Sequence, residues 1–322
     1  MKEVIIRTHF SEKVGLGHLF RTKNLLKELE KKNYKITFAL DNEIKNKKLL
    51  NFNYFFLYSK KKKFTSQSED AVILKKKIGE KNVKYIIVDD YRFDKTWEKY
   101  FYNKGQKIIV FEDINNRKHL CDIIIDSRST DKEILERNYK NLVPKKCKKL
   151  LGPKYSIINP NIKKKVKIKN LNLLFYFGGG GDFKNFKKLI FNFSSIVQKD
   201  NLKNKIIVNI VVGPLAKNYE FLKLLSKKNK FIKIIYNKLD LSFILQKTSF
   251  FFGTASSIVN ELNYLNIPSC LFSVSDNQNQ NLKYKENFGQ FLHLNKKEAL
   301  NTKRIGELLL VLVKNIKRVK NL

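Results

Sequence analysis

The chain has 322 residues, and its 66 lysines and arginines outnumber its 29 aspartates and glutamates, which gives a formal net charge of +37. Hydrophobic residues make up 43% of the chain, which excludes wholesale disorder and predicts sizeable cores, most simply in two domains. The three widely spaced cysteines exclude a disulfide framework or a zinc motif, and no apolar run approaches the ~18 residues of a membrane span, so we expect a cytoplasmic protein.

The first half of the chain predicts strands that alternate with helices. Near-continuous apolar runs, typical of buried strands, occupy residues 3–10, 35–40, 83–91, 106–113 and 121–127. Helical patterns follow the glycine turn as far as about Lys32, cover residues 69–81 and surround Trp97. This alternation indicates a parallel sheet with helices on both faces.

The alternation stops in a link at about 155–170, which carries prolines and a lysine cluster, and then restarts. Strands are predicted at 171–177, 205–213, 231–237, 249–254 and 267–274, and helices at 183–200, 217–229, 239–247 and 255–266. The sequence therefore predicts an α/β protein with two related units, residues 1–160 and 161–322.

The last stretch, from about residue 303 to 322, has apolar residues at helical spacing and a basic end. A membrane surface could bind such an end, but an amphipathic helix more often packs on its own protein. We expect it to pack on the protein, and packing back toward the N-terminal domain is one option.

The excess of positive charge has two interpretations. It could mark a polyanion-binding protein, or it could reflect compositional bias toward lysine, asparagine and isoleucine. Nucleic-acid readers favour arginine, whereas lysine predominates here and is spread through nearly every predicted helix and loop. We therefore favour bias and expect no specific nucleic-acid partner, although a basic surface would still attract an anionic metabolite.

The segment Gly15-Leu16-Gly17-His18 lies between the first predicted strand and its helix. Glycines allow a tight turn, the start of a helix suits an anion, and imidazole can take a proton from water near neutral pH. Open α/β sheets bind ligands at this end of their strands. A structural histidine beside an ordinary turn is the alternative.

Two further segments favour ligand binding in the second unit. Four glycines, residues 178–181, follow its first strand and suit a loop pressed by a bulky ligand, unless they form a plain flexible turn. Thr254, Ser256 or Ser257 could cap the next helix, whose free N–H groups suit a phosphate. Glu261, about one turn later, could accept hydrogen bonds from ribose, although a plain capped helix would look similar.

Two polar groups at strand ends are weaker candidates. Asn277 and Gln278 could contact a sugar or its acetamido group, but a solvated loop explains them equally well. Asp89, Asp90 and Tyr91 end another strand, and paired carboxylates suggest metal or acid–base chemistry, unless one of them caps the next helix.

Taken together, "GLGHLFR", "IIVDDY", "FEDINNRKHLCDIIID", "LLGPKYSII", "FGGGGD" and "GTASSIVNELNYLNIPS…DNQ" occur in the order found in the UDP-sugar hydrolases of pseudaminic acid biosynthesis. The chain resembles UDP-2,4-diacetamido-2,4,6-trideoxy-β-L-altropyranose hydrolases from Val4 to about Asn295. The resemblance implies a GT-B-type fold, in which two Rossmann-like domains face each other across a cleft. It also implies that water attacks the anomeric carbon, inverts its configuration and releases UDP, without a metal or another cofactor.

The resemblance also implies roles for individual residues. His18 matches the general base, and Tyr91 matches a tyrosine near the reacting sugar. The positions that match substrate-binding residues are Gly15, Gly17, Arg21, Gly179, Gly180, Ser256, Ser257, Ile258, Glu261 and Asn277. Of these, Ser256, Ser257 and Ile258 match the diphosphate contacts, Glu261 the ribose contact and Asn277 a sugar contact.

Three positions depart from the family pattern. Gly181 replaces a threonine or serine, Asp90 replaces a histidine, and Asn159 stands where an arginine is frequent. These departures leave the identity of the sugar open more than the type of reaction.

Two other functions stay open. A GT-B glycosyltransferase would use a sugar or lipid acceptor in place of water, and the polyanion-binding protein described above belongs to another class. The partner that we expect is a UDP-linked sugar, bound by a monomer.

Overall fold

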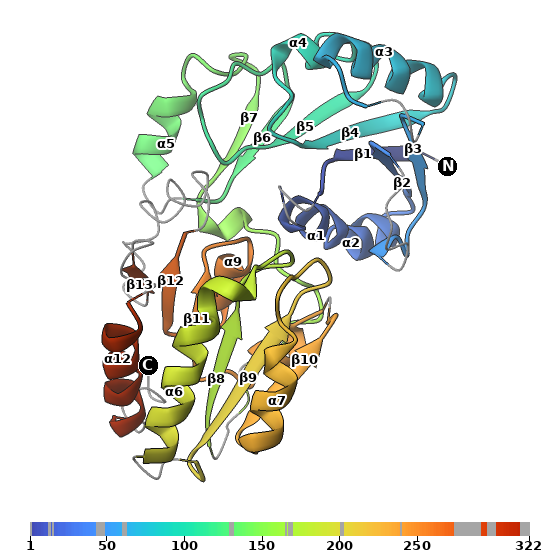
Figure 1. The fold of residues 1–322 in the computed structure, drawn as a ribbon. Coiled ribbons are helices and arrows are strands. Elements are labelled where there is room, and N and C mark those ends of the chain that lie inside the picture. Colours follow the sequence, from blue (N-terminus) through green and yellow to red (C-terminus); the bar gives the residue numbers. More distant parts are fainter. Residues whose placement is uncertain are drawn as a thin grey trace. The chain divides into compact units, whose positions relative to one another are not determined.

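A computed structural model of the chain describes residues 2–11, 14, 16–42, 49–59, 63–128, 132–164, 166, 170–199, 203–238, 240–273, 291–294 and 301–315 (Figure 1). The chain forms two compact units. The first contains Met1–Phe10 and His18–Ile157, and the second contains Ser11–Gly17 and Ile158–Leu322.

The first unit is built on a parallel sheet of seven strands in the order β3-β2-β1-β4-β5-β6-β7. The strands are β1 (Glu3–Thr8), β2 (Lys35–Leu40), β3 (Tyr54–Phe56), β4 (Val83–Asp89), β5 (Lys107–Phe111), β6 (Ile123–Asp126) and β7 (Lys148–Leu151). The helices are α1 (Gly17–Lys23), α2 (Leu26–Lys31), α3 (Gln67–Ile78), α4 (Lys95–Glu98) and α5 (Lys132–Tyr139). In Figure 1, α1 and α2 cover one face of this sheet, and α3 and α4 cover the other.

The second unit has a parallel sheet of six strands in the order β10-β9-β8-β11-β12-β13. The strands are β8 (Leu171–Tyr176), β9 (Ile206–Val212), β10 (Ile232–Tyr236), β11 (Phe250–Thr254), β12 (Ser269–Phe272) and β13 (Phe291–Leu294). Its helices are η3 (Phe183–Phe186), α6 (Lys187–Lys199), α7 (Phe221–Lys228), α8 (Ser242–Leu245), α9 (Ile258–Tyr264) and α12 (Thr302–Lys314), and the short η2 (Pro153–Tyr155) ends the first unit. The predicted fold class, two α/β units with mostly parallel sheets, is confirmed.

Burial on both faces explains why the apolar runs form central strands. Every residue of β1 is buried, and the side chains of β4, β5 and β6 form one core with Leu74, Trp97 and Tyr139 from the helices. Parallel sheets with helices on both faces require this near-continuous hydrophobicity. Elements without it were not predicted: β3 and β13 are short, α5 is mostly polar, and β7 is an edge strand that begins with two exposed lysines.

Local backbone conformation sets several helix ends. The helix predicted as far as Lys32 divides between α1 and α2, and α3 ends at Gly79, whose φ of 56° is left-handed. The helix predicted from residue 217 begins only at Phe221, because Asn218 also takes a left-handed φ, of 55°.

Helix α12 lies beside α6 in the second unit (Figure 1). Gly306 permits this close approach, because a Cβ atom at this position would stand 2.6 Å from Ile196 Cδ1. Residues 316–322, the rest of the predicted last helix, lie outside the described residues. Among the helices that the structure describes, none is both long and apolar enough to cross a membrane.

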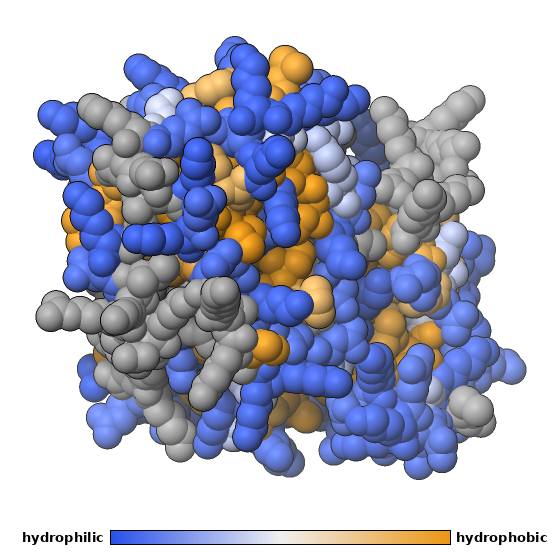
Figure 2. Space-filling view, turned by 90° about the horizontal axis from the view of Figure 1, so that it is seen from below, coloured by the Kyte–Doolittle hydropathy of each residue, from blue (hydrophilic) through white to orange (hydrophobic). Residues whose placement is uncertain are grey.

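The surface mixes charged and apolar side chains. Figure 2 shows one face of the molecule, on which hydrophilic residues surround a central apolar area.

Candidate active site

The candidate site begins at the carboxyl edge of the first sheet, where β1 and β4 are neighbours. The chain runs outward from β1 to β2 and β3 and then returns to β4 on the other side of β1, so the strand order reverses here. Open α/β sheets bind ligands at such a point, because the loops after the two strands diverge and leave a crevice. His18 in the first turn of α1 and Asp89 at the end of β4 both lie at this edge.

His18 is held by a carboxylate. Its side chain is 7% exposed, and its Nδ1 lies 2.6 Å from Oδ1 of Asp89, which is fully buried. A carboxylate accepts hydrogen bonds only, so Nδ1 carries the proton and donates it. The ring's Nε2 has no hydrogen-bond partner within the part of the chain that the structure describes. A neutral His18 therefore presents Nε2 as a proton acceptor, the arrangement of a general base oriented by an acid.

Arg21 joins two carboxylates beside this histidine. Its Nε and Nη2 donate to Asp89 at 2.8 and 2.6 Å, and its Nη1 donates to Asp113 at 2.8 Å. The hydroxyl of Tyr91 donates to the same Asp113 at 2.9 Å, and its ring meets that of His18 edge-on, with centroids 4.5 Å apart. The sequence predicted His18, Arg21 and Tyr91 as separate candidates, and the fold brings them together through Asp89 and Asp113.

The charges of this cluster determine its protonation. Burial lowers the pKa of His18, but the negative charge and hydrogen bond of Asp89 outweigh burial and raise the pKa above its usual value. Burial raises the pKa of Asp113, but the positive charge of Arg21 outweighs it and lowers the pKa to about 2. Burial and the charge of Asp113 raise the pKa of Tyr91, so its hydroxyl stays protonated and can donate.

The neighbouring acid has a different partner. Asp90 accepts from Arg92, with Nη2 to Oδ2 at 2.5 Å, rather than from His18. The pair Asp89 and Asp90 is therefore divided between two arginine networks. Among the described residues, no group of three or more histidine, cysteine, aspartate or glutamate side chains could hold a metal ion.

We predict that Asp89→Asn shifts the pH dependence of the reaction proposed below. Loss of the negative charge lowers the pKa of His18, so a base that acts when neutral becomes competent at lower pH, and the acidic limb of kcat/KM moves to lower pH. The plateau rate should fall about 10²–10⁴-fold, because the ring loses the partner that fixes its proton on Nδ1. A pH–rate profile measures both effects, and Asp90→Asn is the matched control that leaves the limb in place.

In the second unit, the backbone explains some of the glycines. A Cβ on Gly181 would stand 2.5 Å from the carbonyl oxygen of Phe177, and one on Gly213 would stand 2.5 Å from that of Gly179. Gly178 has a left-handed φ of 87°. Close packing therefore requires a glycine at position 181, where the family usually has a hydroxyl residue. Gly179 and Gly180 lie in the turn after β8, at the carboxyl edge of the second sheet.

The segment after β11 holds the other second-unit candidates. Ser256 and Ser257 precede α9, which begins at Ile258, and the side chain of Ser257 makes no capping hydrogen bond. Glu261 accepts a hydrogen bond from the backbone N–H of Asn159 at 3.3 Å, and burial raises its pKa to about 7. The sequence did not predict this contact with the linker.

Asp240 anchors the linker residue Asn159. The Asn159 Nδ2 donates to Asp240 Oδ1 at 2.8 Å, and Asn161 Nδ2 donates to Asp240 Oδ2 at 2.6 Å. Asn159 stands where the hydrolases that the chain resembles frequently have an arginine. In this chain it links the start of the second unit to Asp240 and Glu261.

Two of the predicted site residues, Gly15 and Asn277, lie outside the described residues. Gly17 is described and is the first residue of α1. Asp113 was missed as a site residue, although the two acids Glu112 and Asp113 that follow the buried strand β5 are the signal that could have identified it.

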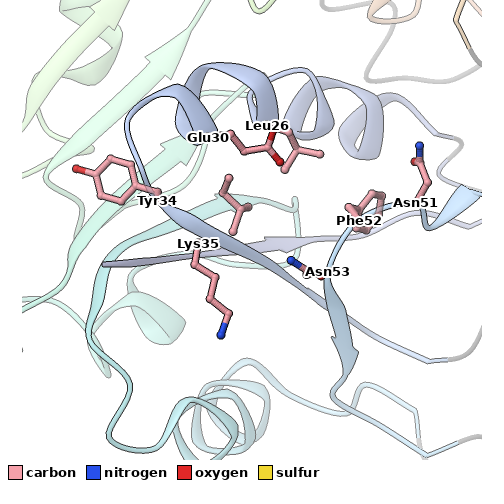
Figure 3. Close-up of a pocket in the computed structure, with 8 residues that line it drawn as sticks. Leu26, Glu30, Tyr34, Lys35, Asn51, Phe52 and Asn53 are labelled. Carbon is pink, nitrogen blue, oxygen red and sulfur yellow. The ribbon is translucent and has the colours of Figure 1, made fainter. Parts of the chain in front are cut away.

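A shallow pocket of about 220 Å³ lies elsewhere in the first unit, next to α2 and the amino end of β2 (Figure 3). Leu26, Glu30, Lys35 and Phe52 are among the residues that line it. It lies at the opposite edge of the sheet from Asp89, so it is not the candidate active site.

The fold is of the GT-B type, in which two Rossmann-like domains follow one another along the chain. Acinetobacter baumannii MurG superimposes with a TM-score of 0.63 at 12% identity, over 100% of this chain and 95% of its own. The spinosyn rhamnosyltransferase SpnG, solved with thymidine diphosphate, gives a TM-score of 0.60 at 9% identity, over 100% and 95%. At such identities, the likeness establishes the fold.

Two relatives match by sequence, and no family model matches the chain. An uncharacterized protein of Methanocaldococcus jannaschii is 26% identical in an alignment of length 321 that covers 94% of this chain but only 61% of that protein. The UDP-2,4-diacetamido-2,4,6-trideoxy-β-L-altropyranose hydrolase of Campylobacter jejuni is 24% identical in an alignment of length 265 that covers 80% of this chain and 87% of that enzyme. The resemblance to this kind of hydrolase, inferred from the sequence motifs, is confirmed.

Proposed function

We propose that the protein is a nucleotide-sugar enzyme that hydrolyses a UDP-linked 2,4-diacetamido-2,4,6-trideoxy sugar to UDP and the free sugar. The observation that carries the proposal is the hydrogen bond between His18 Nδ1 and the buried Asp89, which presents Nε2 as a base. The Campylobacter jejuni relative, named as a hydrolase of a UDP-sugar of this kind, supports the substrate class, and the resemblance of the motifs implies a place in pseudaminic acid biosynthesis.

The proposed reaction needs one strong catalytic group. Nε2 of His18 takes a proton from water as the water oxygen attacks C1 of the sugar, the bond from C1 to the diphosphate oxygen breaks, and C1 inverts. The diphosphate leaves with the electron pair and needs little help from an acid, because it is already a good leaving group. The reaction therefore requires a general base alone, whereas an ordinary inverting glycosidase also needs a separate general acid on the leaving oxygen.

The remaining roles are carried over from the resemblance. Ser256, Ser257 and Ile258 would bind the diphosphate. The N–H of Ser256 already donates to the Thr254 carbonyl at 2.8 Å, so Ser256 would use its hydroxyl, whereas Ser257 and Ile258 could offer N–H groups at the start of the helix. Glu261 would accept hydrogen bonds from the ribose hydroxyls. Tyr91, held in place by Asp113, would contact the sugar next to His18.

A glycosyltransferase is the second candidate, because the same fold occurs in a rhamnosyltransferase. In that case, Nε2 of His18 would deprotonate a sugar or lipid hydroxyl in place of water. A nucleic-acid or polyanion-binding function ranks below both, because the structure contains a carboxylate-oriented imidazole that such a function does not use.

Product analysis tests the proposal and separates the two candidates. Purified protein should convert a UDP-diacetamido-trideoxy sugar to UDP and a reducing sugar without an added acceptor or metal. In water labelled with oxygen-18, the label should enter the sugar and not UDP, and proton NMR should show the inverted anomer first. Turnover that appears only when an acceptor is added would identify a transferase, and an oligonucleotide shift without turnover would contradict both.

A further inference from the structure

A second imidazole lies at the same edge of the first sheet and has no role in the proposed reaction. His9 follows β1 directly, and its Nδ1 lies 2.9 Å from Oδ2 of Asp41, which follows β2. Both side chains are 19% exposed, so they lie at the surface of this edge. Because the carboxylate accepts a hydrogen bond from Nδ1, Nε2 is the atom of His9 that remains for a ligand. No described residue forms a hydrogen bond with it.

Two arginines fix Asp41 in place. Arg7 Nη2 donates to it at 2.5 Å, and Arg92 donates twice, from Nη1 at 2.8 Å and from Nη2 at 3.0 Å. Burial raises the pKa of Asp41, but His9 and the two arginines outweigh it and hold the pKa well below its usual range. An ionised carboxylate fixed by two arginines restricts the ring of His9 in the way that Asp89 restricts that of His18.

The network reaches deep into the core. Arg7 is fully buried and also binds Asp70, which accepts hydrogen bonds from Tyr58 and Trp97 at 2.7 and 2.8 Å. The buried charge of Arg7 requires these carboxylates in any case. Their fixed positions also hold Asp41, and through it the ring of His9, in one geometry, as a group that contacts a ligand needs.

His9 and His18 belong to one continuous array. Thr8, next to His9, pairs with Asp89 across β1 and β4, and its Oγ1 donates to the Asp89 carbonyl at 3.3 Å. On the other side, Arg92 links Asp41 to Asp90. Adjacent strands are ~5 Å apart, so the ends of β2, β1 and β4 together span ~10 Å, which is wider than a bare hexose ring and leaves room for a substituent of the sugar to reach His9.

We propose that His9 is a specificity-determining residue whose Nε2 forms a hydrogen bond with a polar substituent, a hydroxyl or acylamido group, of the sugar whose C1 is attacked by the water that His18 activates. The proposal rests on the proposed nucleotide-sugar function. It places His9 on the sugar and not on the nucleotide, so its loss should weaken the binding of UDP-sugars and leave the binding of UDP unchanged.

Calorimetric titration of UDP and of a UDP-diacetamido-trideoxy sugar tests this assignment, together with kcat and KM for the latter. His9→Ala should raise the Kd of the UDP-sugar by about 10- to 100-fold, as expected for one lost hydrogen bond in a partly buried site, with the Kd of UDP unchanged. His9→Gln, whose amide can occupy the place of Nε2, should restore most of the affinity.

A matched control removes a buried hydrogen bond of the same unit that lies outside the Asp41 network. Tyr139→Phe deletes the hydrogen bond to Asp126 and should lower Tm while leaving both Kd values in place. The proposal is overturned if His9→Ala binds the UDP-sugar with the wild-type Kd, or if the variant raises the Kd of UDP and that of the UDP-sugar equally.

The two proposals can fail separately. A wild-type protein that binds the UDP-sugar without hydrolysing it would overturn the hydrolase and still allow the comparison at His9. Hydrolysis by the wild type with unchanged sugar affinity in His9→Ala would overturn the role of His9 alone. Absence of any UDP-sugar binding would overturn both.

Discussion

Replacing His18 with asparagine is expected to lower kcat for the UDP-sugar by about 10²–10⁴-fold, the usual contribution of a general base. The asparagine amide can still donate to Asp89 in place of Nδ1–H, but it offers no basic nitrogen in place of Nε2. The affinity for UDP should stay at the wild-type value, because the variant leaves unchanged the residues that we propose to bind UDP. Steady-state kinetics and a UDP titration measure the two quantities.

His18→Gln is the companion variant. Its amide reaches the place of Nε2 without basicity, so it should be as inactive as His18→Asn if proton transfer is the function of the ring. Near-full activity in either variant would show that the base lies elsewhere. A matching loss of UDP affinity and of Tm would instead indicate that the buried ring is structural.

The second large effect is expected in the stability of the first unit, at His119. This side chain is 1% exposed and lies between two buried carboxylates, with Nδ1 2.7 Å from Glu98 and Nε2 2.8 Å from Glu112. Burial lowers its pKa, but the two carboxylates outweigh burial and raise it to about 9. His119 is therefore a buried cation in the folded protein near neutral pH.

The sign of the pH dependence follows from the raised pKa. The folded protein binds a proton at His119 more tightly than the unfolded chain does. The contribution of this proton to the free energy of unfolding is therefore complete below pH 6.5 and is lost as pH rises through about 9. A difference of this size corresponds to roughly 3 kcal/mol, at about 1.4 kcal/mol for each pKa unit. His119→Gln also removes the cation between the two carboxylates, which typically costs about 3–5 kcal/mol for a buried pair, although Glu112 keeps its ion pair with Arg117 and Glu98 keeps the N–H of Leu120.

Urea unfolding across this pH range measures the effect in wild type and His119→Gln. Trp97 is the chain's single tryptophan and is buried in the core of the first unit, so its fluorescence reports on that unit alone. The free-energy difference between the two proteins should be about 3–5 kcal/mol at the acidic end and shrink toward the alkaline end. Parallel curves would show that the ring is not a buried cation.

Local patterns were enough to predict most of the fold. The apolar runs that became β1, β4, β5 and β8 are recognisable because a strand covered on both faces has no polar side to display. Short edge strands such as β7, with its exposed lysines, lack that signal, because only the pairing with β6 shows them to be strands.

The sequence by itself also located His18 on a glycine turn after a buried strand, since both features are local. It could not identify the partners that give this histidine its chemistry. Asp89 lies 71 residues from His18, Asp113 lies 92 residues from Arg21, and Asn159 lies 102 residues from Glu261. Only the order of strands in the sheets brings such residues into contact, because hydrogen bonds and buried charges depend on distances that a linear pattern does not contain.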